Sequence, residues 1–247
     1  MAILEVIKIS INNNYLINYM NVYGEKTHDY ISANDYSFNA GKIYGIICEQ
    51  GAGGEGISQI LTNKVSNVNT QIYIDGMETN NISDLAWYVG KTVKYGRIVN
   101  KELSIKKALE LAVKKYNRYK DIETIIEEFH LSRHRINYGL SNIDVWEKWR
   151  ASIAIGYAAQ KQIFCFPWMD SLYFFDCMFN SSVFRFFKRI TQDGGIIILP
   201  TSREENVKQL ADEIVKIQCP RFKHCISDTE KFKKYFCCLL YTSPSPR

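Results

Sequence analysis

A glycine-rich turn spans residues 51–56, and its pattern is close to that of a phosphate-binding loop. The turn reads Gly51, Ala52, Gly53, Gly54, Glu55, Gly56. In a working loop of the form G-x4-G-K-[ST], backbone N–H groups surround an anion, the lysine reaches the outer phosphates and the hydroxyl holds Mg²⁺. Here glycine stands at the lysine position and glutamate at the hydroxyl position. The sequence therefore predicts the backbone of an anion site without its chemistry, and a turn of an unrelated α/β protein is the alternative.

The segments on both sides of the turn have the periodicity that such a loop requires. An apolar run at residues 43–48 precedes it and predicts a buried strand. Ile57, Ile60 and Leu61 follow it at helical spacing. Strand, turn and helix are thus expected in the order that a phosphate loop needs.

The rest of the chain alternates between strand and helix patterns. Strands are expected near 2–10, 42–48, 71–75, 163–167, 196–200 and 213–218, and helices near 56–64, 104–116, 121–129, 145–160, 178–190 and 204–211. This alternation predicts an α/β fold with a mostly parallel sheet covered on both faces. Residues 85–140 carry three helical patterns and few strong strand signals.

Several segments, in this order, resemble the nucleotide-binding subunit of ATP-binding cassette (ABC) transporters from about residue 2 to residue 218. They are residues 4–8, 34–42, 71–76, 150–159, 163–166, 194–205 and 210–217. The resemblance implies a P-loop NTPase fold of ABC type, with a mostly parallel central sheet, flanking helices, an N-terminal antiparallel β portion and a helical subdomain at about 85–145. We expect one such domain over residues 1–237.

The positions that do chemistry in this family differ in this chain. The family has a Mg²⁺-sensing glutamine before the signature helix, but no glutamine occurs between Gln71 and Gln160. A carboxylate pair should end the core strand, one for Mg²⁺ and one as general base, and Pro167 and Trp168 stand there. The histidine that should contact the γ-phosphate is Ser202. We therefore expect no catalytic residue and no metal ligand.

Two further details concern the same motifs. The serine-glycine-glycine of the signature aligns with residues 144–146, Asp-Val-Trp. In a rival register Asp170 is the Mg²⁺ carboxylate and Ser171 stands at the general-base position, but this places Pro167 in a central strand, where proline is rarely found. Losing one stabilising donor typically costs ~10² to 10³ in rate, so the combined departures predict loss of hydrolysis, with Mg²⁺ not expected.

Nucleotide binding is a separate question from hydrolysis. The loop amides and the helix dipole can still attract an anion, whereas Glu55 puts a negative charge in the first helical turn. The hypothesis is that Glu55 takes the place of the phosphate, so that ATP binding is weak or absent and Glu55→Lys raises nucleotide affinity. Tyr15 and Tyr23 both remain candidates for the family's adenine-stacking aromatic.

Composition fits a soluble cytosolic protein. The net charge of +5 on 247 residues is too mild to indicate nucleic-acid binding. Lysines and arginines at 101–120 are interleaved with apolar residues, which favours an exposed face of an amphipathic helix. Seven cysteines without C-x-x-C spacing indicate reduced thiols, and the pair His130 and His134 favours an exposed helix end over a metal site. No apolar run reaches the ~18 residues needed to span a bilayer.

Three functions remain open. The first is a hydrolysis-dead cassette subunit, cytoplasmic and peripheral to the membrane, that pairs with a transmembrane transporter subunit and with a second ABC subunit as a homo- or heterodimer. The second is a working ATPase of an ABC exporter. The third is a scaffold protein that has kept the fold and left transport. Residues 238–247 resemble a translated sequencing adapter, and we expect the native chain to continue beyond Cys237.

Overall fold

A parallel sheet forms the centre of the molecule. The computed structural model describes residues 4–21, 23–65, 68–79, 82–95 and 101–218. The sheet has the order β13-β5-β12-β11-β8, with all neighbours parallel. Its strands are β5 (Ile43–Ile47), β8 (Ala86–Tyr88), β11 (Ile163–Cys165), β12 (Ile196–Thr201) and β13 (Glu213–Lys216). Every residue of β11 and β12 is buried, as expected for strands covered by other elements on both faces.

A second, antiparallel sheet is built mainly from the N-terminal part of the chain. Its order is β4-β1-β6-β7, from β1 (Val6–Ile11), β4 (Asn34–Asn39), β6 (Thr70–Ile74) and β7 (Met77–Thr79). Side chains in β1 and β4 alternate between buried and more exposed positions. This is the pattern of strands with one face against a core.

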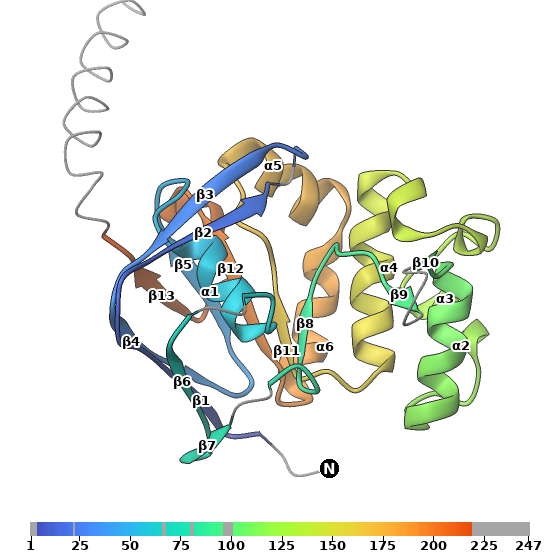
Figure 1. Ribbon diagram of the computed structural model, residues 1–247. Coiled ribbons are helices and arrows are strands. Elements are labelled where there is room, and N and C mark those ends of the chain that lie inside the picture. Colours follow the sequence, from blue (N-terminus) through green and yellow to red (C-terminus); the bar gives the residue numbers. More distant parts are fainter. Residues whose placement is uncertain (1–3, 22, 66–67, 80–81, 96–100, 219–247) are drawn as a thin grey trace, which may run out of the picture.

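A two-stranded hairpin stands apart from both sheets. It consists of β2 (Tyr15–Met20) and β3 (Lys26–Ile31) and pairs with no other described strand. In Figure 1 the hairpin extends from the end of β4 past α1 (Gly54–Leu61) towards α5 (Ser171–Phe175). Ile17 and Ile31 belong to the same buried apolar cluster as Ile57 of α1, so the hairpin is packed onto the helix that follows the glycine-rich turn.

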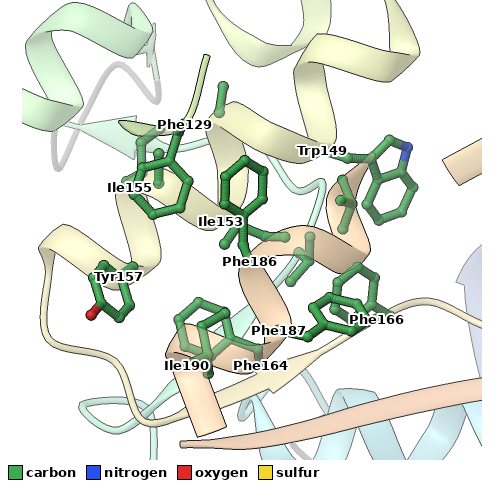
Figure 2. Close-up of a cluster of buried hydrophobic side chains, with 14 of the residues drawn as sticks. Phe129, Trp149, Ile153, Ile155, Tyr157, Phe164, Phe166, Phe186, Phe187 and Ile190 are labelled. Carbon is green, nitrogen blue, oxygen red and sulfur yellow. The ribbon is translucent and has the colours of Figure 1, made fainter. Parts of the chain in front are cut away.

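The remaining helices cover the central sheet and form one end of the molecule (Figure 1). That end contains α2 (Ile105–Tyr116), α3 (Ile122–Glu128) and α4 (Val145–Ala158), the short strands β9 (Lys94–Tyr95) and β10 (Lys101–Glu102), and 3₁₀ turns at Arg135–Asn137 and Leu140–Asn142. After α5 the chain forms a π-helical segment (Asp176–Asn180), a 3₁₀ turn (Val183–Phe186), α6 (Phe187–Gln192) and α7 (Glu204–Val207). Figure 2 shows aromatic side chains of α4, α6 and β11 meeting in the core between them.

The structure confirms the expected α/β class and the N-terminal antiparallel portion. The expected strands all occur, and the basic stretch at 101–120 includes α2, whose lysines are exposed while Ile105 and Leu109 are buried. His130 and His134 are exposed and lie after the end of α3. The expected helix at 178–190 is wrong in form, because a π segment and a 3₁₀ turn occupy most of it.

Two sequence features, the set of cysteines and the adapter-like tail, lie partly or wholly outside the described residues. Cys48, Cys165 and Cys177 are buried free thiols, whereas the other cysteines and the adapter-like tail at 238–247 fall in the part of the chain that is not described. None of the helices in the described part is both long and apolar enough to cross a membrane.

Candidate functional site

The glycine-rich turn connects the end of β5 to the start of α1. Gly51 and Gly53 have φ angles of 81° and 109°, a region in which residues other than glycine are strained. No side chain caps the helix from the N-cap position, Gly53. The first N–H groups of the helix therefore need partners from elsewhere, as they do in a phosphate loop.

A carboxylate on the hairpin accepts hydrogen bonds from two N–H groups at the start of the helix. The Oδ1 atom of Asp29 accepts a hydrogen bond from Gly53 N at 2.7 Å, and Oδ2 accepts one from Gly56 N at 2.6 Å. Asp29 is 1% exposed. A second contact joins the same two elements, since Tyr30 N donates to Gly51 O at 2.8 Å. The anion that occupies the turn is thus part of the chain itself.

Burial makes this carboxylate hard to ionise. The pKa of Asp29 is raised from 3.8 to about 6. Desolvation is the largest cause and the nearby Glu55 carboxylate adds to it, while hydrogen bonds from the loop N–H groups offset the rise only in part. Two acidic side chains therefore share the N-terminal end of α1.

Glu55 does not take the place of a phosphate, which corrects the sequence-based hypothesis. Its Oε2 atom accepts from Trp168 N at 2.8 Å, and Oε1 accepts from Tyr88 Oη at 2.5 Å and from Gln59 Nε2 at 2.8 Å. Burial raises the pKa of Glu55, and these hydrogen bonds lower it again. Glu55 joins α1 to β8 and to the segment after β11, while Asp29 fills the loop.

The structure leaves no room for a lysine at the position where a phosphate loop carries one. A Cβ atom on Gly54 would lie 2.5 Å from Cys48 Sγ and 3.1 Å from Pro200 Cβ. The Trp168 indole closes the same space and donates to Cys48 O at 3.0 Å. Glycine at residue 54 is therefore required by packing.

The last glycine of the turn is needed for the hairpin to fit. A Cβ atom on Gly56 would lie 2.4 Å from Cδ1 and Cγ1 of Ile31 and 3.2 Å from Asp29 Oδ2. Ala52, another residue of the predicted loop 51–56, is buried as well, in a small cluster with Cys48 and Trp168. The hairpin therefore packs directly against the loop.

The segment after β11 contains Pro167, Trp168 and Asp170, the residues of the two registers considered from the sequence. The strand ends at Cys165, so Pro167 lies outside it, although Met169 still forms a parallel bridge with Thr201. Asp170 caps α5 by accepting from Tyr173 N at 2.9 Å, and it also accepts from Tyr23 Oη at 2.5 Å. Asp170 is therefore used as a helix cap and a hairpin contact.

An acidic cleft of about 800 Å³ opens beside this segment, next to the ends of β5 and β12. Four carboxylates line it and one cation, Arg203, accompanies them; the carboxylates belong to Glu49, Asp170, Glu204 and Glu205. A triphosphate that approached the loop from this side would meet net negative charge. In the described residues no three His, Cys, Asp or Glu side chains gather as metal ligands.

The other predicted positions are separate from the loop contacts. Asp144 caps α4 by accepting from Glu147 N at 3.0 Å, and Trp146 in its first turn is 50% exposed. The Tyr15 hydroxyl accepts from Asn69 N at 2.8 Å. Tyr23 packs edge-on against Tyr173, with ring centroids 5.3 Å apart, so neither tyrosine is singled out as an adenine-stacking residue.

Comparison with known proteins agrees on the fold. No protein-family model and no curated protein matches the sequence. Among solved structures, the chain is similar to cbiO1 of Clostridium perfringens, part of the ABC transporter complex cbiONQ, with a TM-score of 0.59 at 13% identity over 87% of this chain and 85% of that one. It is similar to a dimeric ATP-binding cassette bound to ADP and Pi, with a TM-score of 0.61 at 14% identity, covering 86% of this chain and 94% of that one.

A third similar structure is a bacterial Atm1-family ABC exporter with ATP bound, with a TM-score of 0.60 at 12% identity over 88% of this chain and 38% of that one. These likenesses show the fold of an ABC ATP-binding subunit. The residues that fill the turn, above all Asp29, are features of this chain.

Proposed function

We propose that this protein is a hydrolysis-dead relative of ABC ATP-binding subunits that acts as a cytosolic partner of a membrane subunit or of an active cassette. The observation that carries the proposal is the Asp29 carboxylate, which accepts hydrogen bonds from both Gly53 N and Gly56 N. Those N–H groups are the ones that a phosphate would need.

The neighbouring side chains support the same proposal. Gly54 has no space for a lysine, and by the sequence resemblance Pro167 and Trp168 stand where the carboxylate pair of an ATPase is expected. Phosphoryl transfer depends on positioning and charge stabilisation, and none of these residues supplies it. The acidic cleft beside the loop adds repulsion against a triphosphate.

The proposed partners follow from the fold likeness. The similar cbiO1 subunit is part of a transporter complex, and the similar cassette bound to ADP and Pi is a dimer. By analogy we propose a transmembrane transporter subunit and a second cassette subunit as partners. Localisation at the cytoplasmic face of a membrane, through such a partner, belongs to the same proposal.

Two measurements test the proposal. Turnover of Mg²⁺-ATP by the purified protein is expected to equal the rate in buffer, and a Mg²⁺-dependent rate above buffer would refute the loss of hydrolysis. Thermal unfolding with Mg²⁺-ATP reports binding, because a ligand of the folded form stabilises it by mass action. We expect little or no shift for the wild type and a larger one for Asp29→Ala, in which the loop N–H groups are freed. Asp35→Ala, an exposed carboxylate in β4, is the matched control.

A scaffold function outside transport is the second candidate. The filled loop favours it, because a protein that no longer needs nucleotide can keep the carboxylate in place permanently. Co-purification with a multi-spanning membrane protein would favour the cassette partner instead. A working exporter ATPase would require the Mg²⁺-dependent rate described above.

A further inference from the structure

A second cleft lies beside the hairpin strand β2. It is enclosed by β2, the C-terminal part of α1, the segment that follows β8 and the start of α4. Its volume is about 490 Å³, within the range of roughly 300–1,000 Å³ that is typical of small-molecule sites. We refer to this region as the basic cleft.

The charged residues among the described lining of the basic cleft are all cations. They are Lys64, Lys91 and Lys148, and no aspartate or glutamate belongs to that described lining. Within the described part of the chain none of the three forms an ion pair. Burial lowers the pKa of Lys64, and repulsion from Lys91 lowers it further. Lys64 and Lys91 are thus close enough to repel each other, and Lys91 Nζ lies 5.9 Å from the centroid of the Tyr88 ring.

Two residues that line the basic cleft carry a buried polar group with no hydrogen-bond partner among the described residues. The groups are the Tyr19 hydroxyl and the Trp149 indole N–H, and their residues are 8% and 2% exposed. Gln50 is close enough to lower the pKa of the Tyr19 phenol, and Trp149 does the same for Tyr173, but neither pair reaches hydrogen-bond geometry. An unsatisfied buried donor costs about 1–3 kcal/mol, so an acceptor that reaches either group from the cleft is favoured.

The orientation of Trp149 fits this requirement. Its ring stacks on Phe166 in the core, with centroids 5.8 Å apart. In Figure 2 the indole nitrogen points away from the buried apolar cluster. An indole N–H can only donate, and the lysines of the cleft can only donate as well. A ligand rich in acceptors and negative charge would satisfy all of them.

We propose that the basic cleft binds a small multivalent anion, a class that includes phosphate esters and polycarboxylates. The site is distinct from the glycine-rich turn, where Asp29 already occupies the N–H groups. It does not depend on hydrolysis or on the proposed partners. The Glu55 carboxylate raises the pKa of Lys91. Glu55 already accepts hydrogen bonds from Trp168, Tyr88 and Gln59.

Calorimetric titration of the full-length protein with sodium pyrophosphate, and separately with citrate, tests the proposal. We expect saturable binding of at least one probe at submillimolar concentration, weakened by added salt. A response to pyrophosphate alone assigns the site to phosphates, and a response to citrate alone assigns it to carboxylates. No binding of either probe at millimolar concentration would overturn the proposal.

Variants locate the binding. Lys148→Gln and Lys91→Gln should each weaken binding about tenfold or more, because each removes a charged hydrogen bond. Trp149→Phe keeps the aromatic stack and removes only the N–H donor, so it should weaken binding by about fivefold. Lys188→Gln, an exposed lysine of α6, is the matched control and should have no effect. Equal losses in Lys188→Gln and Lys148→Gln, or no loss in any cleft variant, would refute a site in the basic cleft.

Discussion

Replacing Asp29 by asparagine tests whether a buried, ionisable carboxylate fills the glycine-rich turn. The folded-state pKa of Asp29 is about 6, against an ordinary value of 3.8. Between about pH 4 and pH 6 the folded protein therefore binds more protons at this site than the unfolded chain does, so stability falls as pH rises through that window. A shift of about two pKa units corresponds to about 3 kcal/mol.

The Asp29→Asn variant lacks this titration. We expect the difference in unfolding free energy between wild type and variant to change by about 2.4 kcal/mol from pH 4 to pH 7, with the wild type losing stability relative to the variant. Urea denaturation followed by tryptophan fluorescence measures it at each pH. Asp35→Asn, which removes an exposed carboxylate, controls for general charge effects and should give a constant difference. A constant difference for Asp29→Asn, or one with the opposite sign, would show that Asp29 is not buried against the loop.

Three further predictions concern the packing around the turn. Gly54→Ala should lower the free energy of unfolding by about 1–3 kcal/mol, because its Cβ atom overlaps with Cys48 Sγ. In a double-mutant cycle, Cys48→Ala should recover part of that loss. If Gly54→Ala costs the same with Cys48 and with Ala at residue 48, the overlap is not the cause. Glu55→Ala should cost about 1–3 kcal/mol in urea unfolding because Trp168 N loses its buried acceptor, whereas Glu55→Gln, which keeps an acceptor, should cost less. Tyr23→Phe, at the exposed end of the hairpin, should lower the free energy of unfolding by less than about 1 kcal/mol. It should also speed amide hydrogen exchange in β2 and β3. Unchanged exchange would show that the hydrogen bond from Tyr23 Oη to Asp170 does not hold the hairpin in place.

The sequence predicts the parts of the fold that have strong local patterns. The apolar runs at β5 and β12 are buried on both faces and were recognisable as core strands. The three-residue strand β8 is too short to produce a pattern and was not expected. The segment 178–190 has helical periodicity, but a left-handed residue at Ser182 interrupts it, so a π-helical segment, a 3₁₀ turn and α6 form instead of one helix.

The sequence predicts the backbone of the candidate site but not the side chain that fills it. The glycines of the turn and the absence of lysine at residue 54 are visible in the sequence. Asp29 is not, because it comes from the hairpin, 24 residues before the N–H group of Gly53 that it binds. The hairpin strands themselves read YLINYM and KTHDYI, which carry little alternation. Contacts between segments so far apart need the tertiary structure.

The covalent connection between Asp29 and the loop that it fills has a consequence for regulation. A tethered group acts at an effective concentration of the order of millimolar or higher, set by the chain and not by the surroundings. Diffusible anions compete with it only at comparable concentrations. Under the proposed function, diffusible anions below that concentration range therefore do not displace Asp29 from the loop.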